Sequence, residues 1–447
     1  MSLATALVFK VERCQPELVV PTKPTPQEWK QLSDIDDQES FRFQVPMIQF
    51  YRNNSSMKGR DPVKVIKEAV ARTLVFYYPF AGRIREGFGR KLLVECTGEG
   101  ILFIEAKADV TLEQLENSLQ PPYPYIDELL YNVPNSDGIL DSPLLLIQVT
   151  RLNCGGFICA IRFNHVMTDG FGMAQFMMAI AEMARGALSP SILPVWQRDL
   201  LSARDPPRVP CQHPEYDQVD HGNDIEGTMI PFNNMTQRSF FFGPTELSII
   251  RETLPTHFHN CSSSEILTIF IWRLRTIALQ LSQDEEVRLL CLVNLRTKFN
   301  LFPLGYYGNA VALPAALTTV GKLAQNHIGY AIELVEKAKA KVTEEYMKSM
   351  VDLMVMKGRP HFSVVRSLLV ADLTEAGFEE VDYGWGKAIY GGPASGGVGL
   401  VPGLISFCIP FKNRNGEKGI VVPLCLPSPA MERFVAELDA LMNIRTP

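Results

Sequence analysis

Apolar residues recur at helical spacing in two stretches of the first half of the chain. The first follows Asp61 and Pro62, a pair that can cap a helix and fill its first turn, and it predicts a helix that ends before Pro79. The second begins at Gly170 and continues to Arg185. Short apolar runs bounded by turn residues predict strands at 91–95, 101–105, 144–150 and 157–164.

The second half continues this mixture of helix and sheet. Helical spacing predicts helices at 244–254 and 265–281, one long helix within 321–342, and a last helix near 431–442. Apolar runs predict strands at 287–294, 363–370, 404–409 and 419–424. We find neither an internal repeat nor a low-complexity segment. The pattern predicts an α/β protein with mixed sheets.

Two domains are expected from the length of 447 residues, because a single hydrophobic core rarely extends over such a chain. The segment 188–224 carries six prolines and little periodicity, which is typical of a connection. We therefore predict an N-terminal domain at 1–187, a crossover at 188–224 and a C-terminal domain at 225–447.

Charge and cysteine content narrow the class of protein. The 43 Lys and Arg against 49 Asp and Glu give a net charge of −6 without a dense basic patch, so no nucleic-acid partner is expected. No apolar run is long enough to span a membrane, and neither a secretory leader nor a C-terminal address is evident. Nine cysteines without a C-x-x-C pair predict reduced thiols and no zinc site. The expectation is a cytoplasmic protein.

The most informative stretch contains H-x-x-x-D-G, from His165 to Gly170, directly after a predicted strand. Taken alone, it could be a buried core histidine followed by Asp169 as a helix cap. Metal binding would need a third ligand, and none stands at a telling spacing. Imidazole, with an ordinary pKa of about 6.5, also suits a general base. The spacing by itself leaves these alternatives open.

A second motif, Asp382-Tyr383-Gly384-Trp385-Gly386, changes the balance. Together the two motifs resemble the BAHD acyltransferases, a plant family marked by H-x-x-x-D-G near the middle of the chain and D-F-G-W-G near its end; here Tyr replaces the family Phe. The resemblance spans nearly the whole chain, through segments 32–36, 78–83, 294–296 and 307–309. Segments 377–381 and 390–393 most resemble the benzyl alcohol O-benzoyltransferases and fruit alcohol acyltransferases.

The resemblance implies an enzyme of plant specialised metabolism in which His165 is the general base. It would take the proton of an acceptor hydroxyl, which attacks the thioester of acyl-CoA without a covalent acyl-enzyme. Asp169 and Gly170 would shape the loop, with Asp169 paired to Arg296. The alternative for Arg296 is a solvated surface position. The loop Asp382–Gly386, with its two glycines and Trp385, would support the site rather than react.

Coenzyme A binding is less well marked. The resemblance implies a groove near residues 262–264, with Ser263 and Arg296 as candidates, and no permanently bound cofactor or metal. Hydroxycinnamoyl-transferring relatives carry Thr or Ser where this chain has Ala371. Thr374 and Ser367 lie nearby in the sequence, so the donor to the oxyanion is open.

The implied fold is two chloramphenicol acetyltransferase-like domains with a tunnel at their interface, in a monomer. Benzoyl-CoA with benzyl alcohol or a related alcohol is the expected substrate pair. An amine or polyamine acceptor and a non-catalytic binding protein are the alternatives. Condensation domains of peptide synthetases share H-x-x-x-D-G but normally double the histidine, whereas Asn164 precedes His165 here.

Overall fold

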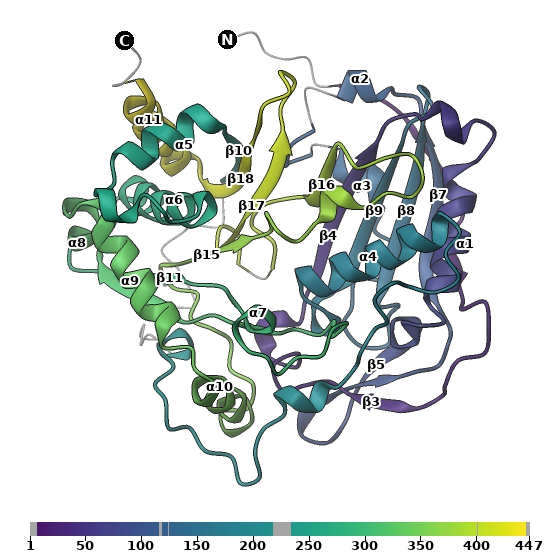
Figure 1. Ribbon diagram of the computed structural model, residues 1–447, viewed down its shortest axis with the longest axis horizontal. Helices are drawn as coiled ribbons and strands as arrows, with labels where there is room; N and C mark the ends of the chain where they lie inside the picture. Colours follow the sequence, from purple (N-terminus) through teal and green to yellow (C-terminus); the bar gives the residue numbers. More distant parts are fainter. Residues whose placement is uncertain (1–6, 116–118, 124, 218–233, 400, 444–447) are drawn as a thin grey trace. The chain divides into compact units, whose positions relative to one another are not determined.

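The computed structural model describes residues 7–115, 119–123, 125–217, 234–399 and 401–443 (Figure 1). The expectations about a leader, a C-terminal address and the end of the crossover fall partly on residues outside these ranges. The chain forms two compact units. Unit 1 consists of 1–202, 301–309 and 376–394, and unit 2 of 203–300, 310–375 and 395–447.

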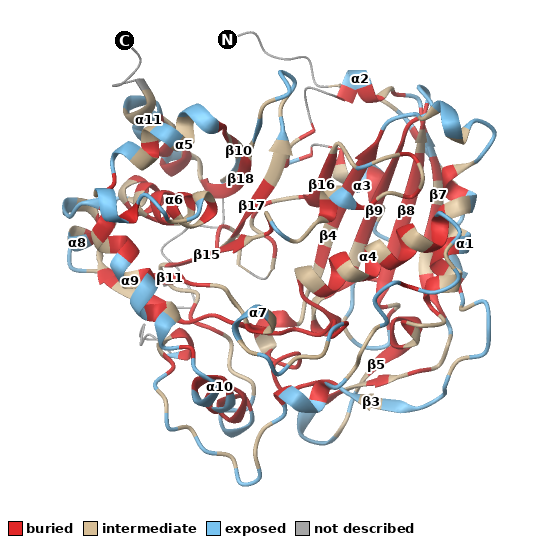
Figure 2. Ribbon diagram, viewed as in Figure 1, coloured by how far each residue is buried: buried red, intermediate tan, exposed pale blue. Residues whose placement is uncertain are grey.

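Unit 1 is built on a sheet in the order β1-β7-β8-β9-β4-β16, with β2 also paired to β7. β7 and β8 are parallel and the other neighbours antiparallel. The bounds are β1 Val11–Arg13, β2 Glu17–Val19, β4 Gln44–Tyr51, β7 Ile101–Ala108, β8 Leu145–Leu152, β9 Phe157–Asn164 and β16 Tyr390–Pro393. Buried residues dominate β8, β9 and the inner part of β4 (Figure 2).

Helices and a small sheet complete unit 1. α1 (Pro62–Thr73) packs against α4 (Gly170–Ala184) and against β8. Asp61 caps α1 by accepting the N–H of Val63, as the sequence predicts. α2 (Leu112–Leu115) and α3 (Ile126–Leu129) are single turns. β3 (Trp29–Gln31), β6 (Leu92–Glu95) and β5 (Arg83–Glu86) form a three-stranded sheet.

Unit 2 contains a six-stranded sheet in the order β10-β18-β17-β15-β11-β14. Its strands are β10 Met235–Phe242, β11 Glu286–Leu290, β14 Ala315–Thr319, β15 Ser367–Asp372, β17 Ile405–Lys412 and β18 Lys418–Pro427; β12 (Val293–Asn294) pairs with β13 (Val311–Ala312). The helices are α5 Pro244–Glu252, α6 Ser263–Leu279, α7 Leu295–Lys298, α8 Val320–Gln325, α9 Ile328–Ala340, α10 Glu344–Met356 and α11 Ser428–Asn443. α6 contributes most of its length to one apolar core with these strands.

Most of the predicted elements are confirmed, but several elements were not predicted, among them β4, β10, β14 and α10. The strand expected at 287–294 is two short strands in different sheets, β11 and β12. Two further differences concern a helix and the domain boundaries. The long helix expected within 321–342 is two helices, α8 and α9, because Asn326 and His327 adopt extended main-chain angles between them. The chain also divides differently from the predicted 1–187, 188–224 and 225–447. Residues 188–202 and 376–394 belong to unit 1. The second of these segments does so because β16 hydrogen-bonds to β4.

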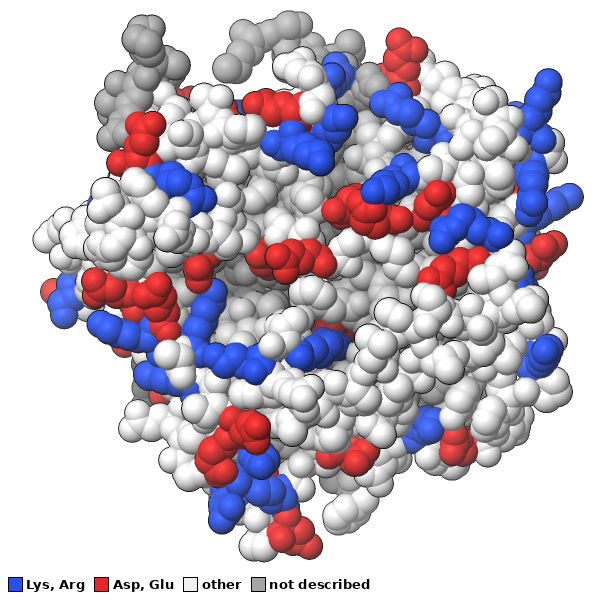
Figure 3. Space-filling model, in the orientation of Figure 1, with Lys and Arg blue, Asp and Glu red and all other residues white. Residues whose placement is uncertain are grey.

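On the face that Figure 3 shows, acidic and basic side chains of the described residues lie intermixed. All nine cysteines lie in the described ranges, and none forms a disulfide. Among the described residues, no helix combines the length and the apolar character needed to cross a bilayer.

Candidate active site

His165 lies in the connection between β9 and α4. β9 ends at Asn164, His165–Met167 form a 3-10 turn, and α4 begins at Gly170. The main-chain N–H of His165 donates to the carbonyl oxygen of Phe43 at 3.0 Å, which extends the pairing of β9 with β4 by one residue. Main-chain hydrogen bonds therefore fix the histidine to the end of a sheet strand.

Three phenylalanine rings surround the half-buried imidazole. Phe41 stacks on it with 4.5 Å between ring centroids, Phe43 lies tilted at 5.2 Å, and Phe163 lies tilted at 6.2 Å. Loss of hydration in this apolar setting lowers the pKa of His165 from its ordinary value, and outweighs nearby carboxylates that favour the imidazolium. At neutral pH the ring is therefore uncharged, the form that accepts a proton.

Asp169 caps α4. Its Oδ1 accepts the N–H of Gly172 at 2.9 Å, and its side chain is buried. Gly170 is the first residue of the helix. Gly172, which sequence reasoning missed, has to lack a side chain, because a Cβ there would overlap Thr168 Oγ1 and the carbonyl of Tyr307. Asp169 belongs to unit 1 and Arg296 to unit 2, and their pairing stays a prediction.

A buried polar network adjoins the His165 turn. Asn309 donates from Nδ2 to the carbonyl oxygen of His165, and Arg198 donates from Nη2 to that of Met167, both at 2.8 Å. Both side chains also contact the carboxylate of Asp36. The sequence places Asp36 and Asn309 in segments of family resemblance without giving them a role, and it gives no signal for Arg198.

The loop Asp382–Gly386 is tight and packs within unit 1. The carboxylate oxygen Oδ1 of Asp382 accepts the N–H groups of Gly384 and Gly386 at 2.7 and 2.8 Å, and both glycines have positive φ. Trp385 is buried, with its ring edge-on to that of Phe157. The hydroxyl of Tyr383, absent from the family Phe, donates to Gln49 Oε1 at 3.3 Å. The sequence predicts this motif in the C-terminal domain. In the structure it belongs to unit 1, because the neighbouring strand β16 pairs with β4.

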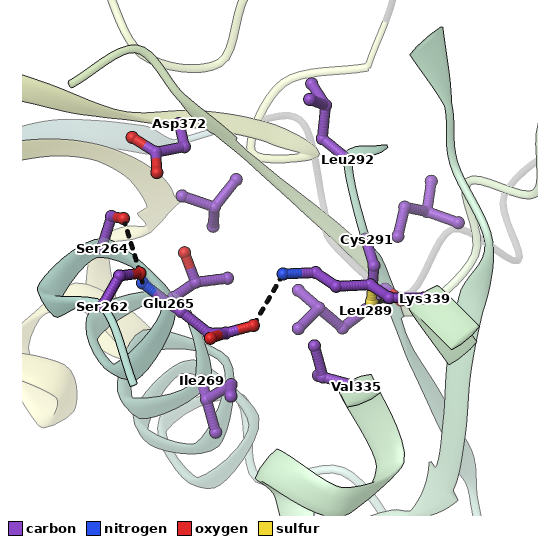
Figure 4. A pocket seen from close by; sticks show the side chains of 13 residues that line it. Ser262, Ser264, Glu265, Ile269, Leu289, Cys291, Leu292, Val335, Lys339 and Asp372 are labelled. Atoms are coloured by element: carbon purple, nitrogen blue, oxygen red, sulfur yellow. Dashed lines mark hydrogen bonds and ion pairs between the residues drawn. The ribbon is translucent and has the colours of Figure 1, made fainter. Parts of the chain in front are cut away.

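A cavity of about 140 Å³ lies inside unit 2, beside the start of α6 (Figure 4). Ser262 and Ser264 line it, whereas the predicted Ser263 does not and accepts a hydrogen bond from Arg251. Lys339 points across the cavity to Glu265 and forms an ion pair of 2.7 Å. Arg296, the other coenzyme candidate, is not among the lining residues and is only partly exposed, on α7.

The two hydroxyl residues near Ala371 in the sequence, Thr374 and Ser367, donate their hydroxyls to neighbouring groups. Ala371 lies on the buried strand β15. Thr374 donates from Oγ1 to Asp372 at 2.6 Å, and Ser367 donates to the carbonyl of Val365 at 3.2 Å. Within the described ranges, no cluster of three or more His, Cys, Asp or Glu is arranged to hold a metal ion.

Comparison with known sequences places the chain among plant enzymes. The model of the transferase family matches residues 9–441. The benzyl alcohol O-benzoyltransferase of Petunia hybrida is 63% identical over 441 residues, which cover 98% of this chain and 95% of the relative. That of Nicotiana tabacum is 62% identical, with coverage of 99% and 96%. An alcohol acyl transferase 1 of Malus domestica is 54% identical, with coverage of 97% and 95%.

Solved structures agree with the fold. Vinorine synthase superposes with a TM-score of 0.74 at 21% identity, covering 97% of this chain and 98% of the other. TRI101 of F. sporotrichioides, in complex with coenzyme A and T-2, superposes with a TM-score of 0.66 at 16% identity and coverage of 92% and 97%. With a family match over almost its full length and relatives above 60% identity, this chain belongs to the transferase family whose two motifs it carries, the BAHD acyltransferases.

Proposed function

We propose that this acyltransferase transfers a benzoyl group from benzoyl-CoA to benzyl alcohol or a related small alcohol, with His165 as the general base. The observation that carries the proposal is the neutral imidazole among phenylalanine rings at the end of β9. Such apolar surroundings suit aromatic substrates, since rings pack favourably against rings. The names of relatives above 60% identity support the same substrate pair.

The reaction needs only the proton transfers of one imidazole. His165 takes the hydroxyl proton as the alcohol oxygen attacks the carbonyl carbon of the thioester. The tetrahedral intermediate collapses, the C–S bond breaks, and the imidazolium returns the proton to the leaving thiolate. The products are the ester and free coenzyme A, and the histidine is neutral again.

His165→Ala tests the role of the base. Loss of a positioned general base typically costs about 10² to 10⁴-fold in rate. The wild-type chain and the variant are incubated with a matrix of acyl-CoAs and acceptors, and ester and released thiol are both measured. Ester formation that depends on His165 is expected with benzoyl-CoA and benzyl alcohol. Amide formation with amines but no ester, or turnover unchanged in the folded variant, would contradict the proposal.

The cavity of unit 2 is the proposed contact for the anionic part of coenzyme A. Its support is the position of Lys339 on the wall, since an ammonium group is a usual phosphate ligand. Ser262 and Ser264 add hydroxyl donors on the opposite side of the cavity, beside Glu265.

Lys339→Ala should raise the KM for acyl-CoA and leave kcat largely unchanged, because it removes binding that the ground state and the transition state share. Lys337→Ala is the matched control. This lysine lies on the same helix, is 71% exposed, and pairs only with Glu333 among the contacts described. Equal KM values for the two variants at low ionic strength would place the coenzyme elsewhere.

A further inference from the structure

Unit 1 buries a pair of opposite charges near the His165 turn. The side chains of Arg198 and Asp36 are 2% and 0% exposed, and Nη1 of Arg198 lies 3.2 Å from each carboxylate oxygen. A buried ion pair often stabilises a fold no more than apolar residues of the same size, because both charges lose their hydration. Fold stability alone therefore does not account for this pair.

The carboxylate of Asp36 is saturated with hydrogen bonds. Oδ2 accepts the N–H and the hydroxyl of Ser33 at 3.0 and 2.7 Å. Oδ1 accepts the main-chain N–H of Asn309 at 2.9 Å and its Nδ2 at 2.8 Å. Hydrogen bonds to a carboxylate are about twice as strong as neutral ones, so Asp36 holds Asn309 firmly by both groups.

Both partners of Asp36 reach the turn that carries the imidazole. Nδ2 of Asn309 bonds the carbonyl oxygen of His165, and Nη2 of Arg198 bonds that of Met167. These are the first and last residues of the 3-10 turn. One carboxylate thus anchors both ends of the turn.

Aromatic rings and a glycine pack against the guanidinium of Arg198. Its guanidinium lies over the rings of Trp196 and Tyr307, at 4.4 and 4.9 Å from their centroids. Gly308, between Tyr307 and Asn309, is needed there, because a Cβ at that position would overlap Nη1 of Arg198.

We propose that Asp36 is a positioning residue for the acyl transfer, acting through Arg198 and Asn309 on the main chain of the His165 turn. This inference rests on the proposed function. A displacement of about 1 Å in a catalytic group can cost about 10²-fold in rate, so a base on a short turn gains from such an anchor. The carboxylate also contributes charge. Asp36 and Asp169 are the acidic groups whose charge favours the protonated form of His165.

The neighbouring residue Asp37 provides a matched control. Its side chain is also 0% exposed and is paired with an arginine, Arg42, at 2.9 Å. Its other oxygen accepts the N–H of Leu92 at 3.2 Å. Among the contacts described, neither Arg42 nor Leu92 hydrogen-bonds to the His165 turn, although Arg42 stands in the sequence between Phe41 and Phe43, whose rings contact the imidazole. A merely structural role predicts the same outcome for both aspartates.

The test compares Asp36→Asn with Asp37→Asn for Tm, kcat, KM and the pH profile of ester formation. The Tm of both variants should be lower than that of the wild-type chain. Only Asp36→Asn should lower kcat, by about 10²-fold, with KM for both substrates nearly unchanged. Its acid limb should also move to lower pH, because the imidazolium has lost a neighbouring negative charge. Equal kcat in the two variants, or an equal loss, would overturn the proposal.

A second variant decides the matter if Asp36→Asn does not fold. Asn309→Ala keeps the ion pair and removes the contact to the carbonyl of His165. It should lower kcat with KM retained, and a wild-type kcat would overturn the proposal. Failure of the proposed function is distinguishable, since it would appear as absence of ester formation by the wild-type chain or as unchanged activity of His165→Ala.

Discussion

At the scale of single residues, the apolar surroundings of His165 should be visible in the pH dependence of the reaction. Burial lowers the pKa of this imidazole, so the base stays unprotonated to lower pH than in water. We expect the acid limb of kcat/KM below the ordinary histidine value of about 6.5, with the rate lost as pH falls through the lowered pKa. Initial rates across this range measure it. An acid limb above that value would contradict the burial described.

The sequence assigns His165 the role of the base because the two motifs together resemble the BAHD acyltransferases, whereas the first motif and its place after a predicted strand leave other roles open. It does not show the role of Arg198, because this residue lies in a proline-rich stretch and its partner Asp36 is 162 positions away. A side chain whose role depends on a distant carboxylate leaves no local pattern. The sequence also does not show why Gly172 and Gly308 must be glycines. Only the neighbouring atoms in the folded chain show that a Cβ at either position would overlap them.

At the scale of elements, Asp169 both caps α4 and carries a negative charge near His165. Two substitutions separate these roles. Asp169→Ala removes both the cap and the charge, and should cost about 1 kcal/mol of stability, the usual loss for an N-cap. Asp169→Asn keeps the cap, because Asn caps helices as well as Asp does, and removes only the charge.

Chemical unfolding and ester formation are measured for both variants of Asp169. We expect the Asn variant to lose activity together with some stability, because the predicted pairing of Asp169 with Arg296 shapes the loop. A loss of activity at unchanged stability would favour a direct role of this charge in the reaction. Full activity of Asp169→Asn would mean that this charge is not used in the reaction.

Local signals account for the elements that were predicted, although not every element with such a signal was found. α1 and α4 follow from their caps and periodicity, and β9 from an apolar run that ends at the motif. α10 was missed, although its first turn has a Thr343 cap and two glutamates. β16 has only four residues and is a strand because β4 supplies its partner.

At the scale of the whole molecule, the state of the buried thiols helps to decide whether both substrates bind before transfer or an acyl-enzyme forms first. Burial raises the pKa of Cys96, Cys159 and Cys291 to about 12, which leaves these cysteines protonated and unreactive at neutral pH. Direct attack by the alcohol requires both substrates to be bound together. We therefore expect intersecting double-reciprocal plots, the sequential pattern.

The measurement varies both substrates in the initial-rate experiment. Parallel lines would indicate a covalent acyl-enzyme. So would an acylated peptide recovered after incubation with benzoyl-CoA alone. His165→Ala serves as the control for non-enzymatic transfer.

Unit 1 is discontinuous in the chain, and this affects the order in which it can be completed during synthesis. The strand β16, which covers β4, ends at Pro393, so a nascent chain that stops at residue 202 leaves the hydrogen-bonding edge of β4 open. An open apolar edge pairs readily with other chains. The ribosome must therefore make most of unit 2 before the sheet that carries His165 can close, and a fragment cut at the first unit boundary should aggregate rather than fold.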